Sequence, residues 1–195
     1  MNTAFILGNG VSRQAVDPAV LRTLGEVYGC NALYREFEPA VLVSTDAPIS
    51  RQIQESGYSK LHTHYTRKPL PNSGSQKIPS QYYGFSSGPA AVGIAAINHN
   101  RSIYLVGFDM GPNKHGMFNN MYAGTEFYKS ASASPTYTGN WVRQLLQIAK
   151  DFPKVRFVRV MGDTTADIQE LNGTQNLSNM SMKDFLDRIN NTKEF

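Results

Sequence analysis

Glycine, asparagine and aspartate residues follow directly after three apolar segments of the sequence. A turn without side chains lets a phosphate approach backbone N–H groups, and asparagine or aspartate side chains can orient a base and a ribose. If the apolar segments are parallel strands, their carboxyl ends lie at one edge of a sheet, where ligands bind in folds of this kind. The residues are Gly8, Asn9 and Gly10 after the first segment, Asp46 after another, and Asp109 after residues 102–108.

The glycine turn itself, Gly8-Asn9-Gly10-Val11-Ser12-Arg13, matches a phosphate-binding motif only in part. It is not a Walker motif, and the third glycine of a dinucleotide-binding fingerprint is replaced by Arg13. Two interpretations therefore remain open. Residues 8–13 either bind a nucleotide or form a tight structural turn between a strand and a helix.

The elements that must position these residues alternate along the chain. Short apolar runs predict strands at residues 3–7, 27–29, 40–45, 102–108 and 155–160. Capping residues predict helices at about 17–24, from Ser50 to Gly57, at 86–98, at 139–150 and after the capping box Ser181–Asp184. This alternation predicts an α/β fold, in which a single nucleotide-binding domain over residues 1–195 builds one Rossmann-like, doubly wound, mainly parallel sheet with helices on both faces.

Two long segments between these elements predict mobile loops. Residues from about 66 to 82 contain three prolines together with glycine and serines, a composition that suits neither a helix nor a central strand. The cations in this segment, Arg67, Lys68 and Lys77, could hold nucleic acid, but a disordered basic lid or a contact with a substrate phosphate is the preferred interpretation. Residues from about 111 to 136 are rich in Asn, Gly, Tyr and Phe, and we expect them to close over a bound ligand.

Composition and charge exclude several classes of protein. Of the 195 residues, 41% are hydrophobic and 17% charged, so we expect one ordered domain. No run of about 18 apolar residues predicts a membrane span, and no basic segment precedes the first apolar run as in a signal peptide, so we expect a cytoplasmic protein. A formal net charge of +4 favours an anionic partner such as a nucleotide, a phosphosugar or nucleic acid. A homo-oligomer is compatible with the sequence.

Few residues in the sequence suit a metal ion. The lone Cys30 supplies no thiolate cluster, and His62 and His64 alternate along a predicted strand without carboxylate or cysteine neighbours to complete a site. An exposed or substrate-facing histidine pair is the preferred interpretation. The sequence also lacks an Asp-x-Asp pair to hold a divalent cation beside a nucleotide diphosphate. We therefore expect that no metal and no other cofactor is required.

Two separated blocks of the sequence share their order and spacing with a known family. The first block is Gly8-Asn9-Gly10-Val11-Ser12 followed by Asp17 and by Cys30-Asn31. The second is Ser86-Ser87-Gly88 followed by an alanine-rich helix and the strand Ile103-Tyr104-Leu105-Val106-Gly107-Phe108-Asp109. Together they resemble the single-domain bacterial sialyltransferases that use CMP-activated sialic acid, over about a third of the chain. The Gly-Asn-Gly opening is also similar, more distantly, to that of pterin pyrophosphokinase-like proteins.

The resemblance implies a set of nucleotide-binding residues at the edge of the sheet. Asp46 stands where the family has an asparagine after its third strand. Phosphate-binding phenols would come from Tyr122, Tyr128 or Tyr137, because the family's tyrosine corresponds to Gly111. Together with the glycine turn, the predicted nucleotide-binding residues are Gly8, Asn9, Gly10, Ser12, Arg13, Asn31, Asp46, Ser87, Gly88 and Tyr122, with Asp109 beside them.

Catalysis is assigned to Asp109 and His115. The general-base histidine of the family has no counterpart here, and its substrate-binding arginine corresponds to Gly84, which removes the cation that would bind a sialic-acid carboxylate. His115 lies six residues past Asp109, and an imidazole suits the removal of a proton from an acceptor hydroxyl near neutral pH. A solvated loop histidine is the alternative interpretation. His99 lies at a predicted helix end, where the helix dipole explains it.

The sequence therefore predicts a metal-independent glycosyltransferase that uses a nucleotide-activated sugar, with a CMP-sugar preferred and the acceptor unidentified. Modified DNA is one acceptor that the positive charge of the chain allows. Two alternatives stay open. One is a Mg²⁺-dependent pyrophosphokinase-like transferase, which would use carboxylates such as Asp46 and Asp109. The other is a non-catalytic nucleotide-binding module, which the loss of the family's arginine, tyrosine and histidine favours.

Overall fold

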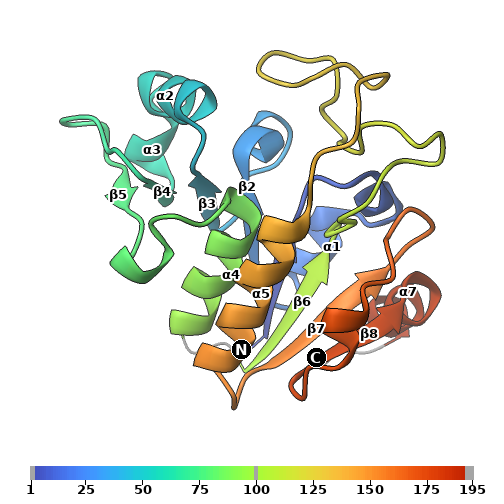
Figure 1. Cartoon of the computed structure of the whole chain (residues 1–195). Coiled ribbons are helices and arrows are strands. Elements are labelled where there is room, and N and C mark those ends of the chain that lie inside the picture. The colour runs from blue at the N-terminus through green and yellow to red at the C-terminus, as the bar shows by residue number, and fades with distance from the viewer. Residues whose placement is uncertain (1–2, 99–100, 192–195) are drawn as a thin grey trace.

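The computed structural model describes residues 3–98 and 101–191. These residues form one sheet of eight parallel strands, in the order β5-β4-β3-β2-β1-β6-β7-β8, with seven α-helices packed against it. The predicted fold class, a doubly wound parallel sheet with helices on both faces, is confirmed (Figure 1). None of the helices in this described part of the chain has the length and hydrophobicity that a membrane crossing requires.

Five of the strands lie where the sequence predicts them. They are β1 (Thr3–Leu7), β2 (Glu26–Cys30), β3 (Val41–Ser44), β6 (Ser102–Val106) and β7 (Arg156–Met161). Three further strands lie toward the two edges of the sheet, namely β4 (His64–Thr66), β5 (Gln76–Lys77) and β8 (Leu177–Ser181). These segments are short or polar, so they lack the apolar run that marks the inner strands.

The strand order places a switch point at the centre of the sheet, beside β1. From β1 the chain adds β2, β3, β4 and β5 outward on one side. After helix α4 (Ser87–Ile97) it returns to pair β6 with β1 on the other side, and β7 and β8 follow. In doubly wound sheets, ligands bind at this switch point, in the crevice beyond the carboxyl ends of the strands.

Two hydrophobic clusters, one on each face of the sheet, hold the layers together. Successive residues of a strand point to opposite faces, so Ala4 and Ile6 of β1 belong to one cluster and Phe5 and Leu7 to the other. Because both faces are covered, β1 and β3 are buried along their whole length and form continuous apolar runs in the sequence. The first cluster includes residues of α4, α5 (Gly139–Asp151) and α6 (Gln169–Asn172), and the second includes residues of α1 (Pro18–Arg22), α2 (Ala47–Glu55) and α7 (Met182–Asn191).

The helix starts agree with the sequence in α1 but not in α2. Asp17 caps α1 as predicted, because its Oδ1 accepts a hydrogen bond from Ala19 N (2.9 Å). The prediction that Ser50 caps the next helix is wrong. Helix α2 begins directly after Asp46, and Ser50 lies buried inside it with its hydroxyl bonded to Thr66.

The two segments predicted as loops differ in regularity. The first, at residues 66–82, contains the edge strand β5 and a 3-10 turn at Ser80–Tyr82. The second is longer than predicted, because residues 107–138 between β6 and α5 form no helix or strand. Figure 1 shows this long loop in yellow, at the end of the sheet toward which β6 points. It is placed to cover the carboxyl ends of the strands.

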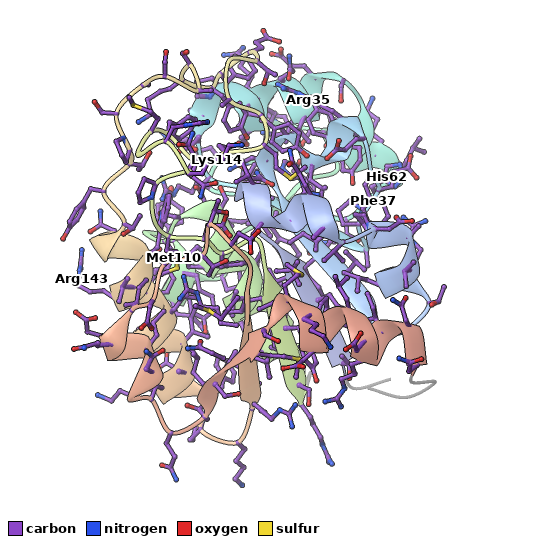
Figure 2. The ribbon with its side chains drawn as sticks, turned by 90° about the vertical axis from the view of Figure 1, so that its right-hand side faces the viewer. Arg35, Phe37, His62, Met110, Lys114 and Arg143 are labelled. Atoms are coloured by element: carbon purple, nitrogen blue, oxygen red, sulfur yellow. The ribbon has the colours of Figure 1, made fainter. Side chains whose placement is uncertain are left out.

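The predicted pair of alternating histidines is not formed. Helix α3 (Tyr58–Leu61) ends before His62, whose ring stacks on Tyr58 with the centroids 4.5 Å apart. His64 lies in β4 and is fully buried. In Figure 2, His62 lies near Phe37 and away from Lys114. His99 lies outside the described residues.

Candidate functional site

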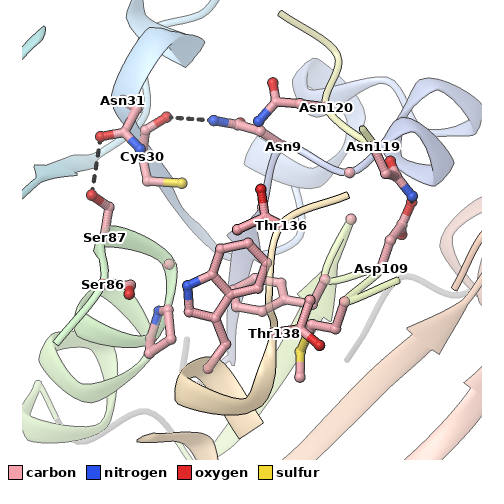
Figure 3. A pocket seen from close by; sticks show the side chains of 18 of the residues that line it. Asn9, Cys30, Asn31, Ser86, Ser87, Asp109, Asn119, Asn120, Thr136 and Thr138 are labelled. Carbon is pink, nitrogen blue, oxygen red and sulfur yellow. Dashed lines mark hydrogen bonds between the residues drawn. The ribbon is translucent and has the colours of Figure 1, made fainter. Parts of the chain in front are cut away.

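A cavity of about 350 Å³ lies at the switch point between β1 and β6. This volume is within the range of about 300–1,000 Å³ typical of small-molecule sites. Figure 3 shows the polar side chains that surround it, which come from segments after β1, β2, β3 and β6, from the start of α4 and from the long loop. The predicted site residues in its lining are Gly8, Asn9, Gly10, Asn31, Asp46, Ser87, Gly88 and Asp109.

The glycine turn packs so closely against the segment after β6 that side chains are excluded. A Cβ on Gly10 would lie 2.4 Å from Asp109 Cγ, and a Cβ on Gly8 would lie 2.6 Å from Gly107 O. Gly107 has a φ of +75°, a conformation that glycine adopts without strain. The glycines therefore let two backbone segments meet at the edge of the cavity.

Most N–H groups of the glycine turn are already bonded within the protein. Gly8 N donates to Val106 O (2.8 Å), Gly10 N to Gly107 O (2.9 Å), Val11 N to Asn119 Oδ1 (2.9 Å) and Ser12 N to Asp109 Oδ2 (3.1 Å). These groups are not free to bind a phosphate. The observation favours the structural interpretation of the turn over the phosphate-binding one, and it leaves the Asn9 side chain as the group of the turn that is open to a ligand.

Asn9, which lines the cavity, has a buried amide oxygen without a hydrogen-bond partner. Its Nδ2 donates to Cys30 O (3.2 Å), whereas Oδ1 has no hydrogen-bond partner although the residue is only 9% exposed. An unpaired buried acceptor costs about 1–3 kcal/mol, so a ligand that donates a hydrogen bond here would be stabilised. The neighbouring Cys30 thiol is buried, and burial raises its pKa to about 12, so it stays protonated and is not a nucleophile.

A chain of hydrogen bonds fixes Asn31 against the start of α4. Ser87 Oγ donates to Asn31 Oδ1 (3.0 Å) and accepts from Thr45 N (2.9 Å). Because the Ser87 hydroxyl has one proton, the Thr45 hydroxyl must be the donor in the remaining Oγ1–Oγ pair (2.9 Å). Asn31 adopts a left-handed backbone conformation (φ 51°), and its Nδ2 has no partner within the described residues. This amide group can therefore donate to a ligand.

Asp46 and the N-terminus of α4 add opposite charges to the same wall of the cavity. Asp46 is exposed, makes no capping bond to α2 and forms no ion pair within residues 3–98 and 101–191. The first N–H groups of an α-helix have no intrahelical acceptor, and the helix dipole makes this end positive. Ser87 and Gly88 carry the N-terminus of α4 to the cavity. This wall can therefore bind a phosphate at α4 and hydroxyl groups at Asp46.

Asp109 is a centre of internal hydrogen bonds rather than a free carboxylate. Its oxygens accept hydrogen bonds from Ser12 N, Ser12 Oγ, Asn119 Nδ2, Thr164 Oγ1 and Thr165 Oγ1. A carboxylate has about four acceptor positions, so none remains for a ribose or for a proton from an acceptor. These bonds give Asp109 a positioning role, because they join the glycine turn to the long loop and to the segment after β7; its catalytic role stays a prediction.

Arg159 of β7 is a buried cation that sequence reasoning missed. It is 0% exposed, and its guanidinium donates to Phe108 O, Asp109 O and Ala166 O at 2.7–3.1 Å. Burial lowers its pKa to about 10, an effect opposed by the carboxylates of Asp109 and Asp167. The guanidinium therefore stays charged at neutral pH and fixes the backbone around Asp109. Its only signal in the sequence is an arginine inside an otherwise apolar strand.

Ser12, Arg13 and Tyr122, which are predicted to bind the nucleotide, do not line this cavity. Ser12 bonds to Asp109. Arg13 is 2% exposed and donates to Tyr122 Oη (2.9 Å) and to Glu36 Oε1 (3.3 Å), while Tyr122 Oη donates to Glu36 Oε1 (2.6 Å). Burial raises the pKa of the Tyr122 phenol. These side chains connect the glycine turn to the long loop and to Glu36, which is a structural role.

His115 lies in a second cavity beside the first. This cavity has a volume of about 480 Å³, and its lining includes Ser12, Gln14, Lys114, His115, Asp163 and Thr164. The two cavities share a wall, because Asp109 in the first lining accepts hydrogen bonds from Ser12 and Thr164 in the second. His115 is exposed, and the structure does not bring this predicted base together with the predicted nucleotide site.

No metal centre is formed by the described part of the chain. There, no group of three or more His, Cys, Asp or Glu side chains is placed to hold a metal ion. His64 instead shares hydrogen bonds with Ser44 Oγ (Nε2, 2.7 Å) and Ser75 Oγ (Nδ1, 2.8 Å). Burial lowers the pKa of His64 to about 4, so its ring is neutral at physiological pH.

Comparison with known proteins assigns no family to this geometry. No family model matches the chain, and neither a curated protein nor a solved structure matches it. The resemblance to sialyltransferases therefore depends on the two sequence blocks alone. The cavity at the switch point is the independent basis for a functional argument.

Proposed function

We propose that the chain is a metal-independent glycosyltransferase that binds a nucleotide-activated sugar in the cavity at the switch point. The observation that carries this proposal is the unpaired Oδ1 of Asn9, a buried acceptor in the lining at the place where doubly wound sheets bind nucleotides. A free donor on Asn31 and a free acceptor on Asp46 lie in the same lining. The resemblance of two sequence blocks to nucleotide-sugar transferases supports the same class of ligand.

In this proposal the nucleoside lies between Asn9 and Asn31. Asn9 Oδ1 accepts a hydrogen bond from a ribose hydroxyl or a base amine, and Asn31 Nδ2 donates to a base carbonyl. Asp46 accepts a hydrogen bond from a remaining hydroxyl group. The phosphate lies at the N-terminus of α4, where the helix dipole and the first N–H groups favour an anion. This single positive site can be occupied by a monophosphate such as that of CMP, or by one phosphate of a nucleoside diphosphate.

In the transfer step the acceptor oxygen forms a bond to the anomeric carbon, the bond between that carbon and the phosphate oxygen breaks, the nucleotide leaves, and the acceptor hydroxyl loses its proton. The Asp46 carboxylate in the lining can accept this proton, whereas His115 could do so only for an acceptor that reaches into the second cavity. The long loop contributes Phe118, Asn119 and Asn120 to the wall. In the proposed reaction this loop excludes water, which would otherwise hydrolyse the donor.

Titration calorimetry with a panel of nucleoside monophosphates and diphosphates tests the binding step. We expect one nucleotide to bind with a Kd in the micromolar range, with or without EDTA. Asn9→Ala should weaken this binding by about tenfold, because it removes the acceptor that the ligand satisfies. Asn179→Ala, on the exposed edge strand β8, is the matched control and should leave the Kd unchanged. If no nucleotide in the panel binds to the folded protein, the proposal is wrong.

A non-catalytic nucleotide-binding module is the second candidate. The observation that favours it is the lining itself, in which the described residues include no histidine, lysine or arginine. Incubation with a nucleotide sugar and candidate acceptors, modified DNA among them, separates the two functions. Released nucleotide indicates transfer, whereas intact ligand recovered after long incubation indicates a module. Metal-dependent hydrolysis of ATP, or metal-dependent transfer from ATP, would instead indicate the Mg²⁺-dependent pyrophosphokinase-like alternative, for which Asp46 is the lining carboxylate with free oxygens.

A further inference from the structure

The charges around the cavity constrain the sugar, in an inference that rests on the proposed function. The lining contributed by the described residues holds two carboxylates, Asp46 and Asp109, and no cationic side chain. The charge of Asp109 is compensated by five hydrogen-bond donations and by the nearby Arg159. The charge of Asp46 has no such compensation. The positive end of α4 remains to attract an anion, and one phosphate of the donor is enough to occupy it.

Four large apolar side chains belong to the lining, and we refer to this set as the apolar wall. They are Phe108 and Met110 after β6, Phe118 in the long loop and Trp141 in α5. Trp141 is half-buried and packs against the hydrophobic cluster that includes α4 and α5, which restrains the indole ring at the cavity. The hydroxyl groups of Thr136 and Thr138, just before α5, lie in the same lining. This wall therefore combines an aromatic surface with neutral hydrogen-bonding groups.

A carboxylate placed against this wall would be unpaired. Moving an ionised carboxylate out of water costs several kcal/mol unless a cation or several donors pair with it, and the uncompensated charge of Asp46 would repel it. A neutral sugar ring offers an apolar face to Trp141 and hydroxyl groups to Thr136 and Thr138. The lining therefore suits a neutral ring and opposes an acidic one.

We infer that the transferred group is a neutral sugar whose ring lies against Trp141, and that the cavity discriminates against sugars that carry a carboxylate. Discrimination arises from the apolar wall and from Asp46, whereas the nucleotide is held by other groups around Asn9, Asn31 and the start of α4. The chain would then differ in its donor sugar from the sialyltransferases that its sequence blocks resemble.

A matched pair of donors tests this inference on the unaltered protein. The nucleoside selected by the panel is linked as its diphosphate to glucose or to glucuronate, which differ only at carbon 6, and the plain nucleoside diphosphate is the reference ligand. We expect calorimetry to show glucuronate-donor binding at least about tenfold weaker than glucose-donor binding. CMP-sialic acid should likewise bind no more tightly than CMP.

The outcomes separate the two proposals. Glucuronate-donor binding as tight as glucose-donor binding, or CMP-sialic acid binding tighter than CMP, overturns the neutral-sugar inference while the proposed nucleotide site stands. If neither the reference diphosphate nor CMP binds, the proposed function fails and the inference fails with it. Each result therefore decides at least one of the two.

Variants of Thr138 and Trp141 test whether the side chains around these two residues discriminate between neutral and acidic sugars. Thr138→Lys adds a cation to the lining, and Thr138→Met is an uncharged control of similar length. We expect Thr138→Lys to narrow the glucose-to-glucuronate affinity ratio by about tenfold relative to Thr138→Met. Trp141→Leu should remove the affinity that glucose adds to the reference diphosphate. An unchanged ratio in Thr138→Lys, or an unchanged glucose contribution in Trp141→Leu, contradicts the assignment of this wall to the sugar. Binding of the reference diphosphate checks that each variant is folded.

Discussion

The two sides of the cavity use similar residues in opposite ways. On the side of β1 and β6, the N–H groups of the glycine turn and the oxygens of Asp109 are bonded to other protein groups. On the side of β2, β3 and α4, Asn31 Nδ2 and the Asp46 carboxylate have no such partner within the described chain. Asn9 follows β1, but its side chain reaches the end of β2, where Nδ2 donates to Cys30 O and Oδ1 is unpaired. The comparison teaches that polar residues at strand ends show where a site lies, whereas their hydrogen bonds decide which of them build it and which bind a ligand.

The largest difference is expected when the two aspartates are exchanged for alanine. Asp109→Ala removes the carboxylate that accepts hydrogen bonds from four residues and one of the two carboxylates that act on the buried Arg159, so it should lower the free energy of unfolding by about 3–5 kcal/mol. Asp46→Ala should change it by less than about 0.5 kcal/mol while weakening nucleotide binding. Urea unfolding and calorimetry measure the two effects. Equal destabilisation by both variants would contradict the distinction between the internally bonded Asp109 and the unpaired Asp46.

The same contrast between internal and open polar groups applies to His64, which is bonded to Ser44 and Ser75 in the interior. Burial lowers its pKa to about 4 from an ordinary value of 6.5, so the unfolded chain binds the proton more readily between these pH values. The stability that neutral His64 provides is therefore complete above pH 6.5 and is lost as the pH falls toward 4, by up to about 3 kcal/mol.

Urea unfolding between pH 7 and pH 4.5 checks this expectation. His64→Gln should have a smaller pH dependence of stability than the parent protein, because the titrating group is gone. His62→Gln is the control, since His62 is partly exposed and stacked on Tyr58. A pH dependence that His64→Gln leaves intact would show that another group is responsible.

The smallest effect is expected at the glycine turn. Gly10→Ala places a Cβ 2.4 Å from Asp109 Cγ and forces the two backbone segments apart, so it should lower the free energy of unfolding by about 1–3 kcal/mol. Binding should weaken as well, because the shift displaces Asn9. Gly84→Ala is the control, since a Cβ there meets nothing within 4 Å. If Gly10→Ala unfolds at the same melting temperature as the parent protein, the two backbone segments are not tightly packed. The turn would then have room for a ligand beside its backbone.

The fold is more predictable from sequence at the centre of the sheet than at its edges. β1 and β3 are buried on both faces, and burial demands continuous apolar runs that any window of sequence reveals. Among the described strands, β8 (Leu177–Ser181) pairs with β7 alone and is largely exposed, so polar residues are tolerated in it. It therefore lacks the apolar run by which a strand is recognised in a sequence. The prediction that Ser50 caps a helix is wrong because the partner of its hydroxyl, Thr66, lies 16 residues away along the chain and is brought to it only by the tertiary structure.

The sequence predicts where the candidate site lies, but it does not predict the hydrogen-bond and ion-pair partners of the residues around it. Gly8, Asn9 and Asp46 line the cavity because the carboxyl ends of parallel strands meet at one edge. Arg13 is directed away from it by Glu36 and Tyr122, which are 23 and 109 residues distant along the chain. No local pattern contains such pairings. The buried Arg159 and the displacement of His115 into a second cavity were beyond sequence reasoning for the same reason.

The register of β1 with β6, in which Thr3 pairs with Ser102, has a consequence for biosynthesis. To pair β1 with β6, the chain must close a long loop, and the entropy of loop closure is lost before the contacts between the strands contribute. This pairing therefore forms late and slowly. While the first half of the chain is being translated, β1 is an open edge able to pair with other unfolded chains. The cavity reaches its final form later still, because the Arg159 guanidinium that holds the backbone of Phe108 and Asp109 belongs to β7, which is translated after every segment of the lining.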